Sequence, residues 1–214
     1  MALINIPRLD WYNRALSHVG DYVLTTGSNN LGNPVYTATH TTMKVVGNKV
    51  FGLRLTLNLR TLENTTPAIV SNVFRFPLAT ANLLPVEVYA IRDNLTKRFL
   101  SFSNFSSRTN ADIVSLEPDN SLYVSKTLLD RIGTTASNLS IYYSVKPDFN
   151  VPLTTAVLLD EDMVDAMALG AGARLATILE GDVQKSQLLE QMFQDTLQSL
   201  ARYNNFSYQK SYFV

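Results

Sequence analysis

Hydrophobic residues near the N-terminus recur at spacings of three and four, which is the period of an amphipathic helix. The residues that form this face are Leu9, Tyr12, Leu16 and Val19. Pro7 precedes the run and Gly20 follows it, and these residue types commonly flank helices. A second run, from Pro34 to about Lys49, shows the same spacing more loosely and predicts a second helix. Its expected inner face comprises Val35, Ala38, Thr42, Val45 and Val46.

The pattern changes at Phe51, where hydrophobic residues begin to alternate with polar or small ones. The hydrophobic members of this alternation are Phe51, Leu53, Leu55, Leu57 and Leu59. Such a period of two predicts a half-buried strand. Shorter runs, bounded by Asn, Asp, Pro and Ser, predict further strands at 73–76, 86–91, 99–102, 122–124 and 139–145. The connections are too short for crossover helices, so we expect antiparallel pairing.

A helical hairpin is predicted at 160–204, where the helix period returns. Asp160, Glu161 and Asp162 favour a helix start, because carboxylates there satisfy free N–H groups and oppose the helix dipole. Gly181 suits a left-handed helix end, and Asp182 suits the cap of the next helix. The expected stripe of the first helix is Val164, Met167, Ala168, Ala171, Leu175, Ile178 and Leu179. The expected stripe of the second helix is Leu189, Met192, Phe193, Leu197 and Leu200.

From these stripes we predict a hairpin core composed of Met167, Leu175, Ile178, Leu189, Phe193 and Leu197. The first hairpin helix is also rich in Gly and Ala, and small residues let neighbouring backbones approach closely. We therefore expect this helix to be packed on more than one side. Gly170-Ala171-Gly172 resembles part of a phosphate-binding fingerprint, but its place inside a helix favours a packing role.

The chain ends in an aromatic segment, 205–214, that shows no helical period and is expected to be extended. Exposed aromatic residues at a chain end lower solubility unless another surface covers them. We therefore predict that this segment contacts a neighbouring subunit or another partner. The expected interface residues are Phe206, Tyr208, Lys210, Tyr212 and Phe213.

Composition narrows the class of function. Only 17% of residues are charged, against about a quarter in typical soluble domains, which suggests that other chains cover part of the surface. Basic and acidic residues balance at 18 each, which disfavours electrostatic binding of nucleic acid. The chain has no cysteine, so neither a disulfide nor a thiolate metal site is possible. We expect neither a signal peptide nor a membrane-spanning helix.

Residues suited to catalysis are sparse. His18 and His40 each lie in a predicted helix, where a structural role is favoured, and no His–carboxylate pair has metal-ligand spacing. The carboxylates of residues 160–165 favour a helix N-terminus, with a divalent ion site as the alternative. Lys97-Arg98, which precedes several phenylalanines, favours a half-buried strand, with a nucleic-acid patch as the alternative. We therefore expect no enzymatic activity, no cofactor and no metal.

Several motifs follow one family pattern along nearly the whole chain. The front motif is Asn13-Arg14-Ala15-Leu16 with Val19-Gly20. The strand motifs are Phe74-Arg75-Phe76-Pro77-Leu78, Leu83-Leu84-Pro85-Val86, and Leu139 to Val145 with Asp148-Phe149. The hairpin motifs are Met163-Val164-Asp165-Ala166-Met167, Arg174-Leu175-Ala176, Leu179-Glu180-Gly181-Asp182, and then Phe193, Leu197 and Ala201. Together they resemble the tail tubular protein A family, the head-to-tail adaptors (ring or connector proteins) of short-tailed bacteriophages. Where that family carries Trp-x-Phe after its second helix, this chain has Val50-Phe51.

The resemblance implies a structural virion protein of the neck or tail, assembled in the host cytoplasm. It implies a homo-oligomer, a closed ring of about twelve copies (a dodecamer). Its expected partners are the portal protein and the tail or further ring proteins. DNA would pass through its channel without sequence-specific binding, and no membrane is involved.

The expected fold class is α+β. The N-terminal helices (1–49) and the hairpin (160–204) would form a helical layer, with an antiparallel β region (50–159) inserted between them and an extended tail (205–214) at the end. The alternative function, from another class, is a β-rich virion attachment or carbohydrate-binding module whose helices only support its sheets.

Overall fold

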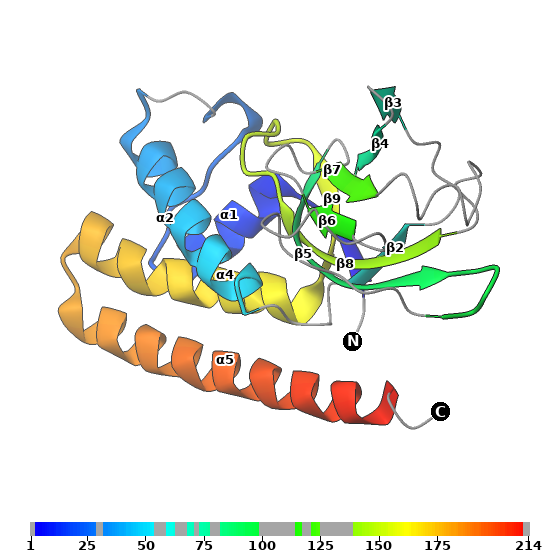
Figure 1. The fold of residues 1–214 in the computed structure, drawn as a ribbon. Coiled ribbons are helices and arrows are strands. Elements are labelled where there is room, and N and C mark those ends of the chain that lie inside the picture. The colour runs from blue at the N-terminus through cyan, green and yellow to red at the C-terminus, as the bar shows by residue number, and fades with distance from the viewer. Residues whose placement is uncertain are drawn as a thin grey trace. The chain divides into compact units, whose positions relative to one another are not determined.

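The fold is α+β, as predicted, with helices from both ends of the chain packed together and antiparallel strands between them in sequence (Figure 1). The computed structural model describes residues 3–28, 32–53, 59–62, 68–70, 73–77, 82–98, 114–116, 121–124 and 139–211. Two compact units divide the chain. The helical unit comprises Met1–Asn58 and Lys146–Val214, and the β-rich unit comprises Leu59–Val145.

A two-stranded ribbon joins the distant ends of the helical unit. Strand β1 (Leu3–Pro7) pairs antiparallel with β9 (Ala156–Asp160). Helix α1 (Arg8–Ser17) follows β1 directly, and α4 (Glu161–Leu175) follows β9. The ribbon therefore brings α1 into contact with α4. Neither strand was predicted from the sequence.

The free backbone N–H groups at the N-termini of the first two helices find hydrogen-bond acceptors in different ways. Pro7 gives α1 no side-chain cap, but the N–H groups of Arg8 and Leu9 donate to the carbonyls of Thr155 (3.1 Å) and Leu153 (2.9 Å). A short 3-10 turn, η1 (Thr26–Ser28), follows α1. Helix α2 (Pro34–Phe51) has Pro in its first turn, and its Asn33 side chain accepts a hydrogen bond from the Tyr36 N–H. These are usual helix N-terminal features.

Helix α2 differs from its prediction in both its length and its buried face. The residues that it buries are Tyr36, Thr39, Thr42, Met43, Val46, Gly47, Val50 and Phe51. Val45, which we placed on the inner face, is exposed. Thr42 and Val46, which the prediction placed on the inner face, are buried there, together with the large side chains of Tyr36 and Met43.

The prediction of a strand that begins at Phe51 is wrong for its first residues. Phe51 is the buried last residue of α2, and the backbone turns at Gly52–Leu53. Phe51 continues the spacing of Met43 and Gly47 on the inner face of the helix. Residues 54–58 lie outside the described residues, and strand β2 (Leu59–Leu62) follows them.

The hairpin forms as predicted around its turn. Helix α4 continues into a π-helical turn, η5 (Ala176–Glu180), and α5 (Val183–Ser211) begins after residues 181–182. Gly181 adopts the left-handed conformation with φ of +67°, which suits a residue without a Cβ atom. The Asp182 carboxylate accepts a hydrogen bond from the Lys185 N–H at 2.9 Å and so caps α5. Asp160 caps α4 by accepting from the Asp162 N–H at 3.1 Å.

Helix α5 runs further than the sequence pattern indicated. Its backbone stays helical to Ser211, where an extended segment was expected from residue 205. Between Val183 and Ser211 there is neither Pro nor Gly to stop the helix. Weak hydrophobic periodicity therefore does not end a helix that lacks a breaker.

Helix α4 is the centre of the helical layer. It contacts α1, α2 and α5, and Figure 1 shows it running between α2 and α5. Eleven of its 15 residues are buried, which confirms that it is packed on more than one side. Its small residues make this possible, because a helix with bulkier side chains needs more space from its neighbours.

The β-rich unit contains two antiparallel arrangements. The strands of the first, in spatial order, are β2, β8 (Leu139–Pro147) and β5 (Leu83–Asp93). The strands of the second, in spatial order, are β3 (Ala68–Val70), β4 (Val73–Pro77), β7 (Ser121–Val124) and β6 (Val114–Leu116). The strands predicted at 73–76, 86–91, 122–124 and 139–145 are thereby confirmed, and the one at 99–102 lies outside the described residues. Among the described helices, none has the length and apolar character needed to cross a bilayer.

Candidate assembly surface

The two helices of the hairpin meet along a tightly packed seam. A Cβ atom added at Gly170 of α4 would lie 2.8 Å from the ring of Phe193 in α5. The Lys49 ammonium of α2 lies 5.0 Å from the centre of the same ring and 4.0 Å from the Glu190 carboxylate. The buried core residues that this confirms are Met167, Leu175, Leu189, Phe193 and Leu197.

Ile178 is not a core residue, and this part of the prediction is wrong. Its side chain is 59% exposed. The cause is the π-helical turn Ala176–Glu180, whose wider i to i+5 hydrogen bonding holds more residues per turn than an α-helix. Counting 100° per residue past Leu175 therefore places Ile178 on the wrong face.

The hairpin carries large apolar side chains that the helical layer does not cover. Leu188 is 60% exposed, Val183 is 55% exposed and Met192, which we predicted on the inner stripe, is 47% exposed. We call Leu188 and Met192, which lie one turn apart on α5, the hairpin patch. A group of exposed apolar residues on one element is typical of a surface that another molecule covers.

The sequence did contain a signal for this patch. Leu188 and Leu189 are adjacent, and neighbours in a helix point about 100° apart, so they cannot both lie at the centre of one buried face. Leu189 is buried and Leu188 is exposed. The prediction selected the correct leucine for the core but assigned no role to the other.

A shallow cleft lies between α2 and the hairpin turn. Its volume is about 460 Å³ and it is lined by Gly32, Pro34, Thr37, Ala38, Thr41, Thr42 and Ile178. None of these residues is charged, and apart from Ile178 all are small or compact. The cleft is therefore suited to apolar side chains rather than to a charged ligand.

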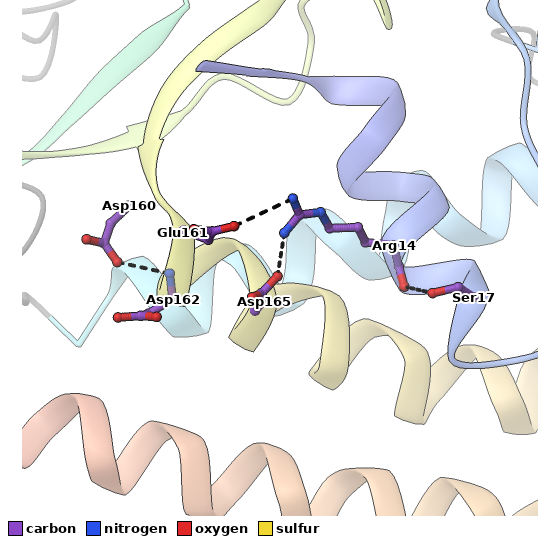
Figure 2. A network of polar contacts seen from close by, with 6 residues as sticks. All are labelled: Arg14, Ser17, Asp160, Glu161, Asp162 and Asp165. Carbon is purple, nitrogen blue, oxygen red and sulfur yellow. Dashed lines mark hydrogen bonds and ion pairs between the residues drawn. The ribbon is translucent and has the colours of Figure 1, made fainter. Parts of the chain in front are cut away.

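Three of the carboxylates at the start of α4, those of Asp160, Glu161 and Asp165, make structural contacts (Figure 2). Arg14 of α1 donates to Asp165 at 2.6 Å and lies 3.9 Å from Glu161. Burial, aided by neighbouring Asp162, raises the pKa of Asp160, while its role as helix cap opposes that change. Arg14 thus ties α1 to the α4 start, which supports the helix-terminus interpretation. In the described part of the chain, no group of three or more His, Cys, Asp or Glu side chains is placed to hold a metal ion.

A polar and aromatic cluster that we did not predict joins α1 to α2. Arg8 is buried, donates to the Tyr36 hydroxyl at 3.0 Å and to the Phe149 carbonyl, and lies over the Tyr12 ring. The Tyr12 hydroxyl lies 2.7 Å from Nδ1 of His40, and the His40 ring stacks on Tyr36. These contacts come from four different turns of two helices, so their spacing in sequence gave no signal.

Protonation in this cluster follows from its burial. Burial raises the pKa of Tyr12, so its hydroxyl keeps its proton and donates to His40. Burial, together with the nearby cations Arg8 and Lys44, lowers the pKa of His40. A neutral His40 accepts at Nδ1, which matches the bond that Tyr12 donates. The cluster therefore stabilises the contact between α1 and α2.

The Gly170-Ala171-Gly172 segment has the packing role that was favoured over phosphate binding. Gly170 faces Phe193, and a Cβ atom at Gly172 would lie 2.7 Å from the Cβ of His18 and 3.2 Å from the Ala15 carbonyl. The two glycines thus admit α5 on one side of α4 and α1 on the other. His18 is a packing residue here, and burial lowers its pKa.

Of the predicted terminal interface residues, the structure describes the backbone of three and does not describe the other two. Phe206, Tyr208 and Lys210 belong to the backbone of α5, and Tyr212 and Phe213 lie outside the described residues. Lys97 of the basic pair has a positive φ of 60°, and the Arg98 carbonyl accepts from the Asp93 N–H in a turn. Phe99, Phe102 and Phe105, which follow that pair, lie outside the described residues.

Comparison with known proteins does not assign this chain to a family. No protein-family model matches this chain, and no curated protein matches it. Function must therefore be argued from the residues, their motifs and the surface described above.

Proposed function

We propose that this chain is a structural virion subunit, a head-to-tail adaptor whose copies form a ring between the portal and the tail of a short-tailed bacteriophage. In this role it extends the DNA channel and performs no catalysis. The ring is a homo-oligomer of about twelve copies, as the resemblance implies. It assembles in the host cytoplasm and stays in the neck of the virion.

The observation that carries the proposal is the hairpin patch. Helix α5 buries Leu189, Phe193 and Leu197 against the helical layer, yet Leu188 and Met192 remain exposed on the same helix. A helix that has filled its core and still presents large apolar residues is suited to assembly. The low share of charged residues, 17%, supports the same interpretation.

The placement of the motifs also supports an adaptor. Phe74 to Pro77 lie on β4, Leu83 to Val86 lie on β5, and Leu139 to Val145 lie on β8. The hairpin motifs lie on α4, around the Gly181 turn and on α5. The balance of 18 basic and 18 acidic residues agrees with a channel through which DNA passes without being gripped.

Electron microscopy of the purified protein, alone and mixed with the portal protein of its virus, tests this proposal. We expect end-on views with cyclic symmetry and a ring attached to one end of the portal. A monodisperse monomer that leaves the portal unchanged contradicts the proposal. Stabilisation by a glycan in a thermal unfolding assay, without any ring, would instead favour the attachment or carbohydrate-binding alternative.

The C-terminal segment has a separate test. We propose that Phe206, Tyr208, Lys210, Tyr212 and Phe213 contact the portal or the adjacent subunit. A chain ending at residue 205 should keep its thermal unfolding temperature to within a few degrees, because the buried hairpin residues end at Leu200 among the described side chains. It should bind the portal more weakly in a sedimentation assay. Unchanged portal binding contradicts this role for the segment but not the ring itself.

A further inference from the structure

The outer face of α2 is a track of small side chains that ends in a lysine. Thr37 and Thr41 line the cleft beside Ile178, and Lys44 follows one turn later on the same face. Lys44 is exposed, and it makes no hydrogen bond or ion pair with any residue in the described ranges. Helix α2 contains no Asp or Glu. The cleft is therefore lined by uncharged and mostly small side chains, and a lysine follows it one turn further along α2.

The exposed flank of α5 is a track of large apolar side chains that ends in a carboxylate. Leu188 and Met192 are one turn apart, and Asp195 follows on the same flank. Asp195 is exposed, and within the described part of the molecule no hydrogen bond or ion pair engages its carboxylate. This flank therefore presents apolar ridges followed by a negative charge.

The two tracks have the same residue spacing, and their side-chain sizes and charges are complementary. Each has steps of four and then three residues: 37, 41 and 44 on α2, and 188, 192 and 195 on α5. Parallel helices in contact along these tracks would bring Leu188 to Thr37, Met192 to Thr41 and Asp195 to Lys44. Large side chains would then fill the space left by small ones, and opposite charges would meet at one end.

The tracks cannot meet within a single chain. Lys49 of α2 already contacts α5 at Glu190 and Phe193. At 100° per residue, Glu190 lies about 200° around the helix from Leu188. The side of α5 that faces α2 is therefore opposite to the side that carries the track. A contact between the tracks requires a second copy of the chain.

We propose that these tracks form the joint between neighbouring copies of this chain. Leu188 and Met192 of one copy enter the cleft of the next copy, and Asp195 of the first lies beside Lys44 of the second. Because the two surfaces differ, the contact is head to tail, and its repetition closes into a ring when the rotation allows. This joint rests on the proposed ring function and assigns its subunit contact.

The absence of cysteine from the chain allows a direct test by disulfide trapping. The variant T41C/M192C, oxidised with glutathione disulfide, should give a ladder of covalently linked multimers on a non-reducing gel. An equal mixture of T41C and M192C should give dimers and nothing larger, and each single variant alone should give neither. T41C/Q187C is the matched control, since Gln187 is also exposed but lies on another side of α5.

A second arm tests the charge pair. Adding K44E to T41C/M192C should slow trapping roughly fivefold, and adding D195K as well should restore the rate, because exposed charge pairs contribute up to about 1 kcal/mol. All the substituted positions are exposed, so every variant should unfold at the wild-type temperature in circular dichroism.

The possible results separate this joint from the ring proposal. A ladder that depends on the 41–192 pair supports the joint. Absence of a ladder overturns it, and electron microscopy with the portal then decides the ring proposal independently. Dimers alone from T41C/M192C indicate a two-fold contact and overturn the head-to-tail arrangement. Equal trapping by T41C/Q187C also overturns it, because the stated register then has no effect.

Discussion

The two helices of the hairpin differ in how they use their surfaces. Helix α4 is built largely from Ala, Gly and Met and buries eleven of its 15 residues among α1, α2 and α5. Helix α5 buries one face only and exposes Leu188 and Met192 beside it. A helix enclosed on several sides can stabilise the fold but has little surface for a partner. A helix at the edge of the layer can do both, so assembly is expected of α5.

The comparison predicts opposite effects for two adjacent residues of α5. Phe193→Ala should lower the free energy of unfolding by about 4 kcal/mol, because it empties a packed site against Gly170. Met192→Ala should change it by less than about 0.5 kcal/mol, because the side chain is exposed. Chemical denaturation measured by circular dichroism checks both values. Equal losses in the two variants would mean that the buried face of α5 is misassigned.

A smaller loss is expected when α4 is made bulkier. Gly170→Ala should destabilise the protein by about 1–2 kcal/mol, since the new methyl group meets the buried Phe193 ring at 2.8 Å. Alanine is the better helix former, which favours the opposite sign, so the sign itself is informative. The double variant with Phe193→Leu should recover part of the loss. A stabilised Gly170→Ala variant would show that the two helices are not in close contact.

Substitution of Gly181, in the turn between α4 and α5, should change stability through the backbone conformation alone. Gly181 has a φ of +67° and an added Cβ atom would meet no atom within 4 Å. Gly181→Ala should therefore cost about 1 kcal/mol of unfolding free energy, through conformational strain rather than a clash. Gly181→Asn is the matched control and should cost less, because Asn tolerates the left-handed region. Equal costs for Ala and Asn would contradict this explanation.

The smallest effect concerns pH and the packing of α1 and α2. Burial lowers the pKa values of His18 and His40 below 6.5, so the unfolded chain takes up protons more readily than the folded one. Stability should be complete above pH 6.5 and should fall as the pH falls from there towards the folded-state pKa values. Thermal unfolding between pH 7.5 and 5.5 checks this. The H18Q/H40Q variant should show a flatter dependence, and an identical slope would assign the effect to other groups.

Elements that depend on neighbouring residues were predictable from the sequence. The helix spacing of Tyr12 and Leu16 indicated α1, and Gly181 with Asp182 indicated the hairpin turn. The glycines of α4 indicated close packing, which their contacts with Phe193 and His18 confirm. In these cases the local chemistry and the tertiary fold favour the same structure.

Features that depend on distant contacts or on helix phase were not predictable. The pairing of β1 with β9 joins segments about 150 residues apart in sequence, which no local pattern specifies. The π-helical turn changes the phase at Ile178, and the end of α2 takes Phe51 away from an otherwise convincing strand pattern. The proposed pairing of the α2 and α5 tracks was not predictable for the same reason, since the two tracks lie in distant parts of the sequence.

The central claim is that the exposed flank of α5 serves assembly and not folding. Its most direct test is the sedimentation mass of Leu188→Asp beside Leu189→Asp and the wild type, each with and without the portal protein. We predict multimers for the wild type. Leu188→Asp should be a folded monomer that still unfolds cooperatively, at a lower temperature than the multimer because association stabilises the folded state, whereas Leu189→Asp should lose its cooperative unfolding because Leu189 is buried. Multimers of unchanged mass from Leu188→Asp, or a wild type that is monomeric under both conditions, would contradict the claim.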